Sequence, residues 1–208
     1  MSRQEHWDQA YEAKGPQGVS WYQRRPEISL RLIAESGVDR RAGVIDIGGG
    51  TSTLVDELLD AGYAPLAVLD VSARALEEAR ARLGARAAEV QWIEQDVTTF
   101  APTHRFGVWH DRAAFHFLTD ARERRLYVAS MRRALVPRGA VVLATFAMDG
   151  PTKCSGLDVV RYDEAGMLAE LGPEFVLEDV RREVHQTPWG SEQRFVYFRL
   201  QWSPPTPG

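Results

Sequence analysis

The chain has 208 residues, of which 44% are hydrophobic and 26% charged, and its net charge is −4. These values are typical of one globular domain with a sizeable core, and they argue against a nucleic-acid partner, which needs a basic surface. One cysteine excludes an intrachain disulfide, and the absence of a signal peptide or an 18-residue apolar run predicts a cytoplasmic protein without membrane contact.

In chain order, the first 25 residues are rich in aromatic residues and turn formers, so we expect an irregular segment there. Pro26 can open a helix, after which apolar runs alternate with amphipathic ones. Strands are expected at about 43–47, 66–70, 89–94, 106–110 and 140–146, and helices at about 52–61, from Ser72, from Asp120 to Leu135, and at about 163–171.

Two long alternating runs, at about 175–183 and 194–202, close the pattern. Only about ten residues join them, too few for a crossover helix, so they should pair antiparallel. The earlier strands should be parallel, with helices on both faces of the sheet. We therefore expect an α/β fold with a doubly wound, Rossmann-like sheet of seven strands, mostly parallel with an antiparallel last strand. Residues 204–208 should form a disordered tail.

A glycine turn, VIDIGGGTSTL at Val44 to Leu54, follows the first expected strand. Glycines let the backbone approach a ligand, and the following helix offers unpaired N–H groups. Asp70 ends the second strand and can accept hydrogen bonds from both ribose hydroxyls of a nucleotide-like cofactor. A dinucleotide fingerprint would have a third glycine where Thr53 stands, which argues against a dinucleotide. A tight turn without a ligand is the alternative.

Asp46, Gly48 and Gly50 form an acid-x-Gly-x-Gly pattern that resembles motif I of class I S-adenosylmethionine-dependent methyltransferases. The later segments VQWIEQDV, FGVWHDRAAFHFL and RRALVPRGAVVLATF resemble further landmarks of that family, in the expected order. The resemblance implies one methyltransferase domain over residues 1–203, with a cofactor-binding core at 40–147 and substrate loops and closing strands at 148–203. It implies S-adenosylmethionine as cofactor and S-adenosylhomocysteine as product.

The ends of the chain carry a narrower resemblance. HWDQAYEAKGPQGVSWYQ is similar to the entry segment of the small type 12 group, which includes relatives of the citrate synthase and elongation factor lysine methyltransferases. The resemblance implies that residues 1–25 fold over the cofactor as a lid, where aromatic faces could stabilise a sulfonium. A helix that packs its rings on the core is the alternative. GPTKCSGLDVVRYD and HQTPWGSEQRF resemble loops of a bacterial branch of this group.

The resemblance also implies the parts of the site. Asp46 would hold the methionine end of the cofactor, Asp70 the ribose and Asp96 the adenine amino group. The expected cofactor-binding residues are Trp21, Asp46, Gly48, Gly49, Gly50, Thr51, Asp70, Val71, Asp96, Val97 and His110.

His110 and Asp111 are the catalytic candidates, because both follow the fourth strand and an imidazole can accept a proton near neutral pH. The alternative is that His110 packs in the strand, and that Asp111 caps the next helix or pairs with Arg112. The expected substrate pocket consists of Tyr22, Arg112, Phe115, Cys154 and His185.

The histidines and Cys154 form no pair at metal-ligand spacing, so we expect no metal. Trp109 to Arg112 stand where many nucleic-acid and glutamine methyltransferases carry Asn/Asp-Pro-Pro-Tyr, which argues against those acceptors. We therefore expect methyl transfer to a small-molecule acceptor such as a thiol or amine, by a monomer or homodimer. A protein lysine acceptor is the alternative, and a non-catalytic cofactor-binding module or a NAD-type oxidoreductase are less favoured interpretations.

Overall fold

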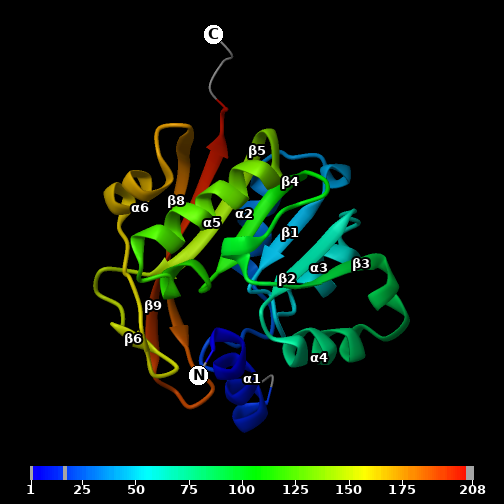
Figure 1. Ribbon diagram of the computed structural model, residues 1–208, viewed down its shortest axis with the longest axis vertical. Helices are drawn as coiled ribbons and strands as arrows, with labels where there is room; N and C mark the ends of the chain where they lie inside the picture. The colour runs from blue at the N-terminus through cyan, green and yellow to red at the C-terminus, as the bar shows by residue number, and fades with distance from the viewer. Residues whose placement is uncertain (1, 16–17, 205–208) are drawn as a thin grey trace.

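The structure is a computed structural model that describes residues 2–15 and 18–204. Within these residues a seven-stranded sheet runs in the order β3-β2-β1-β4-β5-β9-β8 (Figure 1). Its strands are β1 (Val44–Ile47), β2 (Leu66–Asp70), β3 (Val90–Glu94), β4 (Phe106–Arg112), β5 (Leu135–Phe146), β8 (Phe175–Gln186) and β9 (Glu192–Trp202). The helices are α1 (Arg3–Lys14), α2 (Glu27–Glu35), α3 (Leu54–Asp60), α4 (Ala73–Leu83), α5 (Ala121–Ala134) and α6 (Glu164–Leu171).

The strand pairing confirms the expected fold. β3, β2, β1, β4 and β5 are parallel neighbours, and β9 pairs antiparallel with both β5 and β8. Successive residues of a strand point to opposite faces, and both faces of this sheet are covered. α5 and α6 pack on one face with Ile45, Ile47 and Trp109. α2, α3 and α4 pack on the other with Val44, Val68 and Val108.

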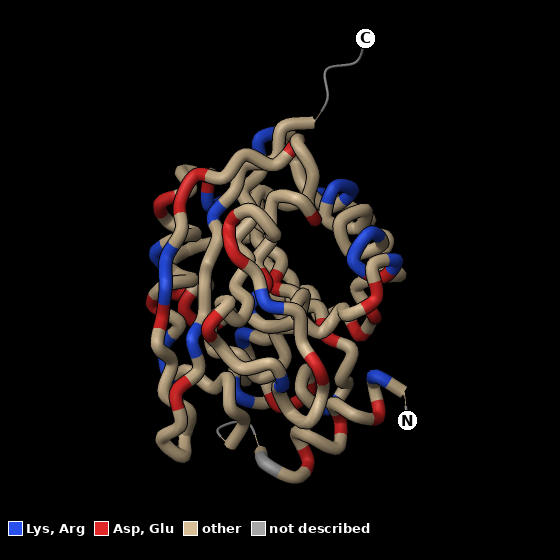
Figure 2. The backbone as a smooth tube through the Cα atoms, turned by 90° about the vertical axis from the view of Figure 1, so that its left-hand side faces the viewer, with Lys and Arg blue, Asp and Glu red and all other residues tan. Residues whose placement is uncertain are grey.

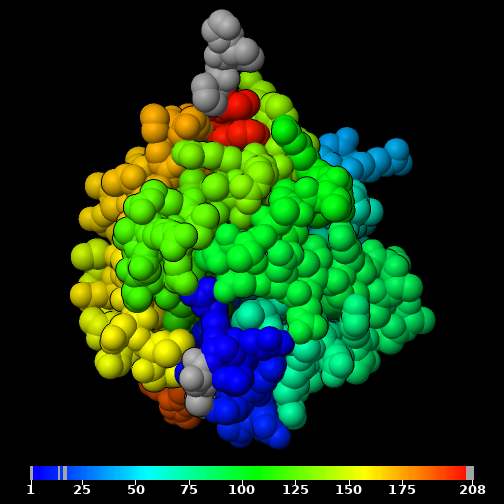
Figure 3. Space-filling model, viewed as in Figure 1, coloured from blue at the N-terminus to red at the C-terminus, as the bar shows by residue number. Residues whose placement is uncertain are grey.

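The first segment differs from the expectation of an irregular stretch, because α1 is a regular helix that begins at a capping box between Ser2 and Glu5. Its apolar residues do not follow a clear helical stripe, so hydrophobic periodicity gave no signal for it. Figure 1 places α1 beside the end of the sheet where β1 and β2 finish, and Figure 3 shows residues 2–15 seated against the core there.

Other boundaries also moved. β5 starts at Leu135, ahead of Pro137 and Gly139, since Leu135 pairs with Phe106 before the register shifts. β8 and β9 extend toward each other, so their connection is shorter than the ten residues expected. A small hairpin, β6 (Lys153–Cys154) and β7 (Leu157–Asp158), was not expected. The predicted tail at 204–208 lies, apart from Pro204, outside the described residues.

The surface agrees with the modest net charge. Figure 2 shows basic and acidic residues interspersed along the chain on the face in view. Arginines of α5 are paired with acids, for example Arg124 with Glu170 and Arg132 with Glu174. None of the helices in the described part of the chain is long and apolar enough to cross a membrane.

Candidate active site

The glycine turn after β1 is built for close approach. Gly48 and Gly50 have φ of +63° and +41°, a region that side chains disfavour. A Cβ on Gly48 would lie 2.7 Å from the Ala114 Cβ, and one on Gly50 would lie 2.6 Å from the Tyr11 hydroxyl. The backbone N–H of Gly48 donates to the Leu69 carbonyl at 2.7 Å, which holds the turn against β2. The turn therefore packs so closely against Ala114 and Tyr11 that only glycine fits at these two positions.

Asp46 and His110 point to the face of the sheet that α2 covers. His110 Nδ1 lies 2.6 Å from Asp46 Oδ1, and His110 Nε2 lies 2.8 Å from the hydroxyl of Ser29 on α2. The other carboxylate oxygen of Asp46 faces the turn, because a Cβ on Gly49 would lie 2.6 Å from it. Asp46 is thus fixed on one side and presents its second oxygen to the loop, where an amino group of a ligand could donate to it.

Asp70 ends β2 with only 6% of its surface exposed. Its Oδ1 accepts the Ser72 N–H at 2.8 Å, while the Ser72 hydroxyl donates to Asp8 of α1 at 2.5 Å. Burial raises the pKa of Asp70 to about 7, and the nearby charge of Asp46 adds to the rise, against the hydrogen bonds from backbone groups that lower it. Ribose hydroxyls are donors that would stabilise this buried carboxylate.

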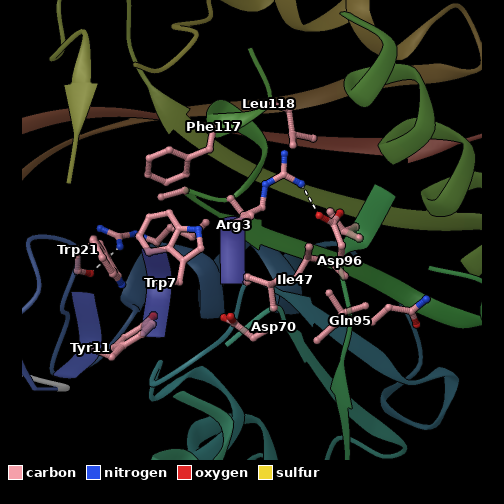
Figure 4. A pocket seen from close by; sticks show the side chains of 17 residues that line it. Arg3, Trp7, Tyr11, Trp21, Ile47, Asp70, Gln95, Asp96, Phe117 and Leu118 are labelled. Carbon is pink, nitrogen blue, oxygen red and sulfur yellow. Dashed lines mark hydrogen bonds and ion pairs between the residues drawn. The ribbon is translucent and has the colours of Figure 1, made fainter. Parts of the chain in front are cut away.

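Asp96 follows β3 and is contacted by α1. Arg3 of α1 reaches across the cleft and donates to Asp96 with one nitrogen and, at 2.7 Å, to Glu123 of α5 with the other (Figure 4). Burial alone would raise the pKa of Asp96, but hydrogen bonds from Thr98 and the charge of Arg3 hold it below its usual value. Asp96 therefore stays ionised and able to accept a further donor.

These groups line one long cavity. Its wider part contains Asp70 and Asp96 and opens to solvent. Its narrower part contains Asp46 and His110, and the two parts share Trp21, Gly48 and Arg112 as lining. Of the expected cofactor residues, all but Gly50 line one or both parts: Trp21, Asp46, Gly48, Gly49, Thr51, Asp70, Val71, Asp96, Val97 and His110.

The hydrogen-bond acceptors along the cavity fit a nucleoside joined to an amino acid. Asp70 and Asp96 at the wide end would hold ribose and adenine, and Asp46 at the narrow end would hold an amino group. Between them stand aromatic rings: Trp7 contacts Trp21 at 5.6 Å and Phe117 at 4.8 Å between ring centroids, both edge to face. Figure 4 shows these rings bordering the cavity on the side of α1. Such faces attract a cation such as a sulfonium.

Asp111 points away from His110, because neighbouring strand residues face opposite sides of the sheet. Its carboxylate is fully buried and accepts hydrogen bonds from the Ala114 N–H at 2.9 Å and the Tyr127 hydroxyl at 2.6 Å. Burial raises its pKa to about 6. Phe115 is also fully buried, between Tyr127 and Tyr162. Neither lines the wider or the narrower part of this cavity, so the structure separates Asp111 from the catalytic position and Phe115 from the substrate pocket that the sequence predicted.

Arg112 links the cavity to the last strands. Its Nε donates to the Tyr197 hydroxyl and its Nη1 to the Trp21 carbonyl, each at 2.8 Å, and its Nη2 lies 3.6 Å from Glu183. Tyr22 lines the narrow part and the opening beyond it.

His185 and Cys154 lie near Ser20. His185 Nε2 is 2.7 Å from the Ser20 carbonyl, and Cys154 Sγ is 3.7 Å from the Ser20 hydroxyl. Cys154 is buried and does not line the cavity. No group of histidine, cysteine and acidic side chains in the described part of the chain has the geometry of a metal site.

The comparisons with known proteins agree with this site. A family model described as a methyltransferase domain matches residues 44–139, the segment that carries the glycine turn, Asp70 and Asp96. Residues 44–139 therefore match a methyltransferase domain, and the fold around them is that of the class I S-adenosylmethionine-dependent methyltransferases. The N-methyltransferase NodS from Bradyrhizobium japonicum WM9, solved with S-adenosylhomocysteine, is similar in fold, with a TM-score of 0.75 and 20% identity over 95% of this chain and 98% of that one.

Two further proteins are similar to this chain, one in fold and one in sequence. A protein solved in a study of the conversion of a disulfide bond into a thioacetal group during echinomycin biosynthesis has a TM-score of 0.79 and 15% identity, over 97% of this chain and 92% of that one. The eEF1A lysine and N-terminal methyltransferase of Bos taurus is 24% identical over 136 residues, 64% of this chain. The match covers only 19% of that relative, so the chain spans about a fifth of its length.

Sequence reasoning missed several residues of this methyltransferase site. Arg3 and Ser29 lie on helices that pack over the cavity, and no local motif marks them. Ala113 and Ala114 line the wide part at a turn where Ala113 has φ of +71°. One signal for this turn was present in the sequence. The alternative interpretation of Asp111 as a cap of the following helix places a turn at Ala113 and Ala114, and Asp111 does accept the Ala114 N–H.

Proposed function

We propose that this methyltransferase acts on a nitrogen or sulfur atom of a small-molecule acceptor. The observation that carries the proposal is how the cavity is covered. α1 roofs the wide part through Arg3, Trp7 and Tyr11, while a separate opening lies beside the narrow part. This opening is lined by Tyr22, Gln23, Arg24, Arg25, His185, Gln186 and Pro188. A small acceptor could enter there and meet the methyl group near Trp21 and Arg112.

The cofactor, when bound, supplies a methyl carbon on an electrophilic sulfonium. The protein has to align the acceptor with that carbon and exclude water, which is where such a displacement gains most of its rate. Asp46, Asp70 and Asp96 would fix the cofactor at three separated points. Trp7 and Trp21 would shield the sulfonium, and Arg112 holds the Trp21 backbone in place.

The structural neighbours support a small nitrogen or sulfur acceptor. Besides NodS, the glycopeptide N-methyltransferase MtfA, solved with S-adenosylmethionine, has a TM-score of 0.68 and 16% identity over 91% of this chain. The echinomycin neighbour concerns sulfur chemistry. These neighbours share the fold of the chain, so small amines and thiols are the first acceptors to test.

A protein lysine acceptor is the second candidate. It is supported by the similarity to the eEF1A lysine and N-terminal methyltransferases of Bos taurus and Mus musculus, at 24% and 25% identity. The side opening could also admit one extended side chain. Trp189, beside Pro188 at the rim of this opening, is 58% exposed and offers an apolar surface to a protein substrate.

The proposal is tested in two steps. Calorimetric titration with S-adenosylmethionine, S-adenosylhomocysteine and NAD should show binding of the first two only; binding of NAD alone would contradict it. Transfer from labelled cofactor is then measured to 2-mercaptoethanol, benzylamine and a lysine-containing peptide. Turnover restricted to the peptide would favour the second candidate. Binding without any turnover, in this panel or in a protein extract, would favour a non-catalytic module.

A further inference from the structure

His185 occupies an unusual position at the end of β8. Only 5% of its surface is exposed, and its Nε2 lies 2.7 Å from the backbone carbonyl of Ser20. A carbonyl oxygen can only accept a hydrogen bond, so Nε2 must carry the hydrogen. In the neutral ring Nδ1 then holds a lone pair. Within the part of the chain that the structure describes, no hydrogen bond reaches Nδ1 and it is not among the buried atoms that lack a partner.

The side chain lies where an acceptor would pass. His185 lines the side opening together with Tyr22 and Gln23, and both of these also line the narrow part of the cofactor cavity beside Gly48 and Arg112. The segment from Ser20 to Gln23 therefore connects the imidazole to the transfer position. Gln23 is itself held by Glu183 of β8 at 2.8 Å, which keeps this segment against the last strands.

The charges around His185 favour its neutral form. Burial and the positive charge of Arg112 on β4 lower its pKa, outweighing the Ser20 carbonyl and the charge of Glu183 on β8. Glu183 is turned toward Arg112 and accepts a hydrogen bond from Tyr197 of β9 at 2.6 Å. The Phe195 ring of β9 faces the imidazole edge to face, and on the far side of the segment Ser20 contacts Cys154 of β6. The ring is thus uncharged at neutral pH and able to take a proton.

Two further histidines, His110 and His116, lie at the end of β4 and just after it. His110 uses Nδ1 toward Asp46 and Nε2 toward Ser29, so neither nitrogen is available to an acceptor. His116 is fully buried between Phe117 and Phe146 and lines neither part of the cofactor cavity nor the side opening. His110 is therefore placed to orient Asp46 rather than to remove a proton.

We propose that His185 Nδ1 accepts the proton of the nucleophile during methyl transfer, a role that rests on the proposed function. The acceptor's lone pair forms the bond to the methyl carbon while the carbon–sulfur bond breaks and leaves its electron pair on sulfur. The acceptor's proton moves to Nδ1, and the imidazolium passes it to water through the side opening. The Ser20 carbonyl holds the ring in the tautomer that this transfer needs.

The test compares His185→Gln with His104→Gln, which changes an exposed histidine outside the cavity. The glutamine amide can keep a donor near the Ser20 carbonyl but offers no titratable base. With the best-used amine or thiol of the panel, we expect kcat to fall about 100-fold in His185→Gln, the usual size of a general-base effect. Affinity for S-adenosylmethionine and the thermal midpoint should match those of His104→Gln. The wild-type decline of kcat at acidic pH should disappear in His185→Gln.

A second measurement needs no acceptor. Long-range 1H–15N spectra of the full chain report the tautomer and pKa of each imidazole, and His185→Gln assigns the signal. We expect the Nε2–H form with a pKa below 6.5; an Nδ1–H form, or a ring charged at pH 7, would overturn the proposal. Unchanged kcat in His185→Gln would overturn this role alone, whereas failure of the wild type to bind S-adenosylmethionine would overturn the proposed function and this role with it.

Discussion

The two ends of the cavity are assembled in different ways. At the cofactor end, the ligand-facing groups lie at the ends of neighbouring parallel strands: Asp46 within the last residues of β1, Asp70 at the end of β2 and Asp96 after β3. At the acceptor end, the groups come from segments far apart in the chain, since Ser20, Arg112 and His185 meet only through the crossing of β4, β8 and the N-terminal segment. Local sequence patterns therefore predict the cofactor end, whereas the acceptor end depends on tertiary packing.

The largest expected effect is at the glycine turn. Gly48→Val should abolish binding of S-adenosylmethionine, because Gly48 has a positive φ and its Cβ would lie 2.7 Å from Ala114. Gly62→Val is the matched control, as Gly62 also has a positive φ but nothing within 4 Å of its Cβ position. Calorimetry on both folded variants checks this. Tight binding by Gly48→Val would show that the turn does not cradle the cofactor.

A substitution of Asp111 tests whether this residue is structural, as its burial indicates, or catalytic. Asp111→Ala should lower the free energy of unfolding by about 3 kcal/mol, because it leaves buried donors of Ala114, Phe115 and Tyr127 without their acceptor. Denaturant unfolding measures the change, and Tyr127→Phe, which removes one of those donors, should cost less. A stable Asp111→Ala protein that had lost only turnover would instead restore Asp111 to a catalytic role.

The residues of the cofactor end could be predicted from the sequence, and most contacts at the acceptor end could not. The order of strands, the glycine turn and the acids at the strand ends could be predicted, since each is a short pattern tied to one strand. The pairing of His110 with Ser29, the turn of Asp111 to the opposite face and the contact of His185 with Ser20 could not. They depend on which helix covers which face and on where antiparallel strands end. A helix at α1 was expected only as the alternative to an irregular segment, because packing rather than hydrophobic periodicity stabilises it.

A second test of the cofactor end is the ribose site. Asp70→Ala should weaken S-adenosylmethionine binding at least tenfold while the fold survives, since the loss of charge-assisted hydrogen bonds to hydroxyls costs roughly 1.5–3 kcal/mol. Calorimetry gives the affinity and thermal unfolding the integrity of the variant. Asp56→Ala, which changes a surface acid of α3 paired with Arg82, is the control and should bind as the wild type does. Equal affinities for the two variants would remove Asp70 from the site.

The pH dependence of S-adenosylmethionine binding is a further test of the role of Asp70. Burial raises the pKa of Asp70 to about 7. Hydrogen bonds from ribose hydroxyls favour the carboxylate, so binding should weaken as pH falls through 7 and the free protein takes up a proton. From pH 8 to pH 6 we expect roughly a three- to tenfold loss of affinity. Asp70→Asn should lose this part of the dependence while retaining whatever comes from the cofactor's own groups. An identical profile in both proteins would contradict the assignment.

The smallest effect concerns α1, the proposed lid, which contacts both ends of the cavity. α1 is tied to the cofactor end by Arg3 on Asp96 and Glu123 and by Gln4 on Glu94, and the same helix places Trp7 against Trp21 near the acceptor end. Arg3→Ala removes the first of these ties. It should speed dissociation of S-adenosylmethionine about two- to fivefold, as expected for partly exposed ion pairs worth 0.5–1 kcal/mol.

Arg3→Lys keeps the charge but cannot bridge both acids, so its dissociation rate should fall between those of Arg3→Ala and the wild type. Arg41→Ala, an exposed arginine far from the lid in sequence, should leave the rate unchanged. Stopped-flow measurement of tryptophan fluorescence follows the release, because Trp7 and Trp21 border the cavity. Slower release in Arg3→Ala would mean that Arg3 competes with the adenine for Asp96, and that the tie opposes the cofactor rather than retaining it.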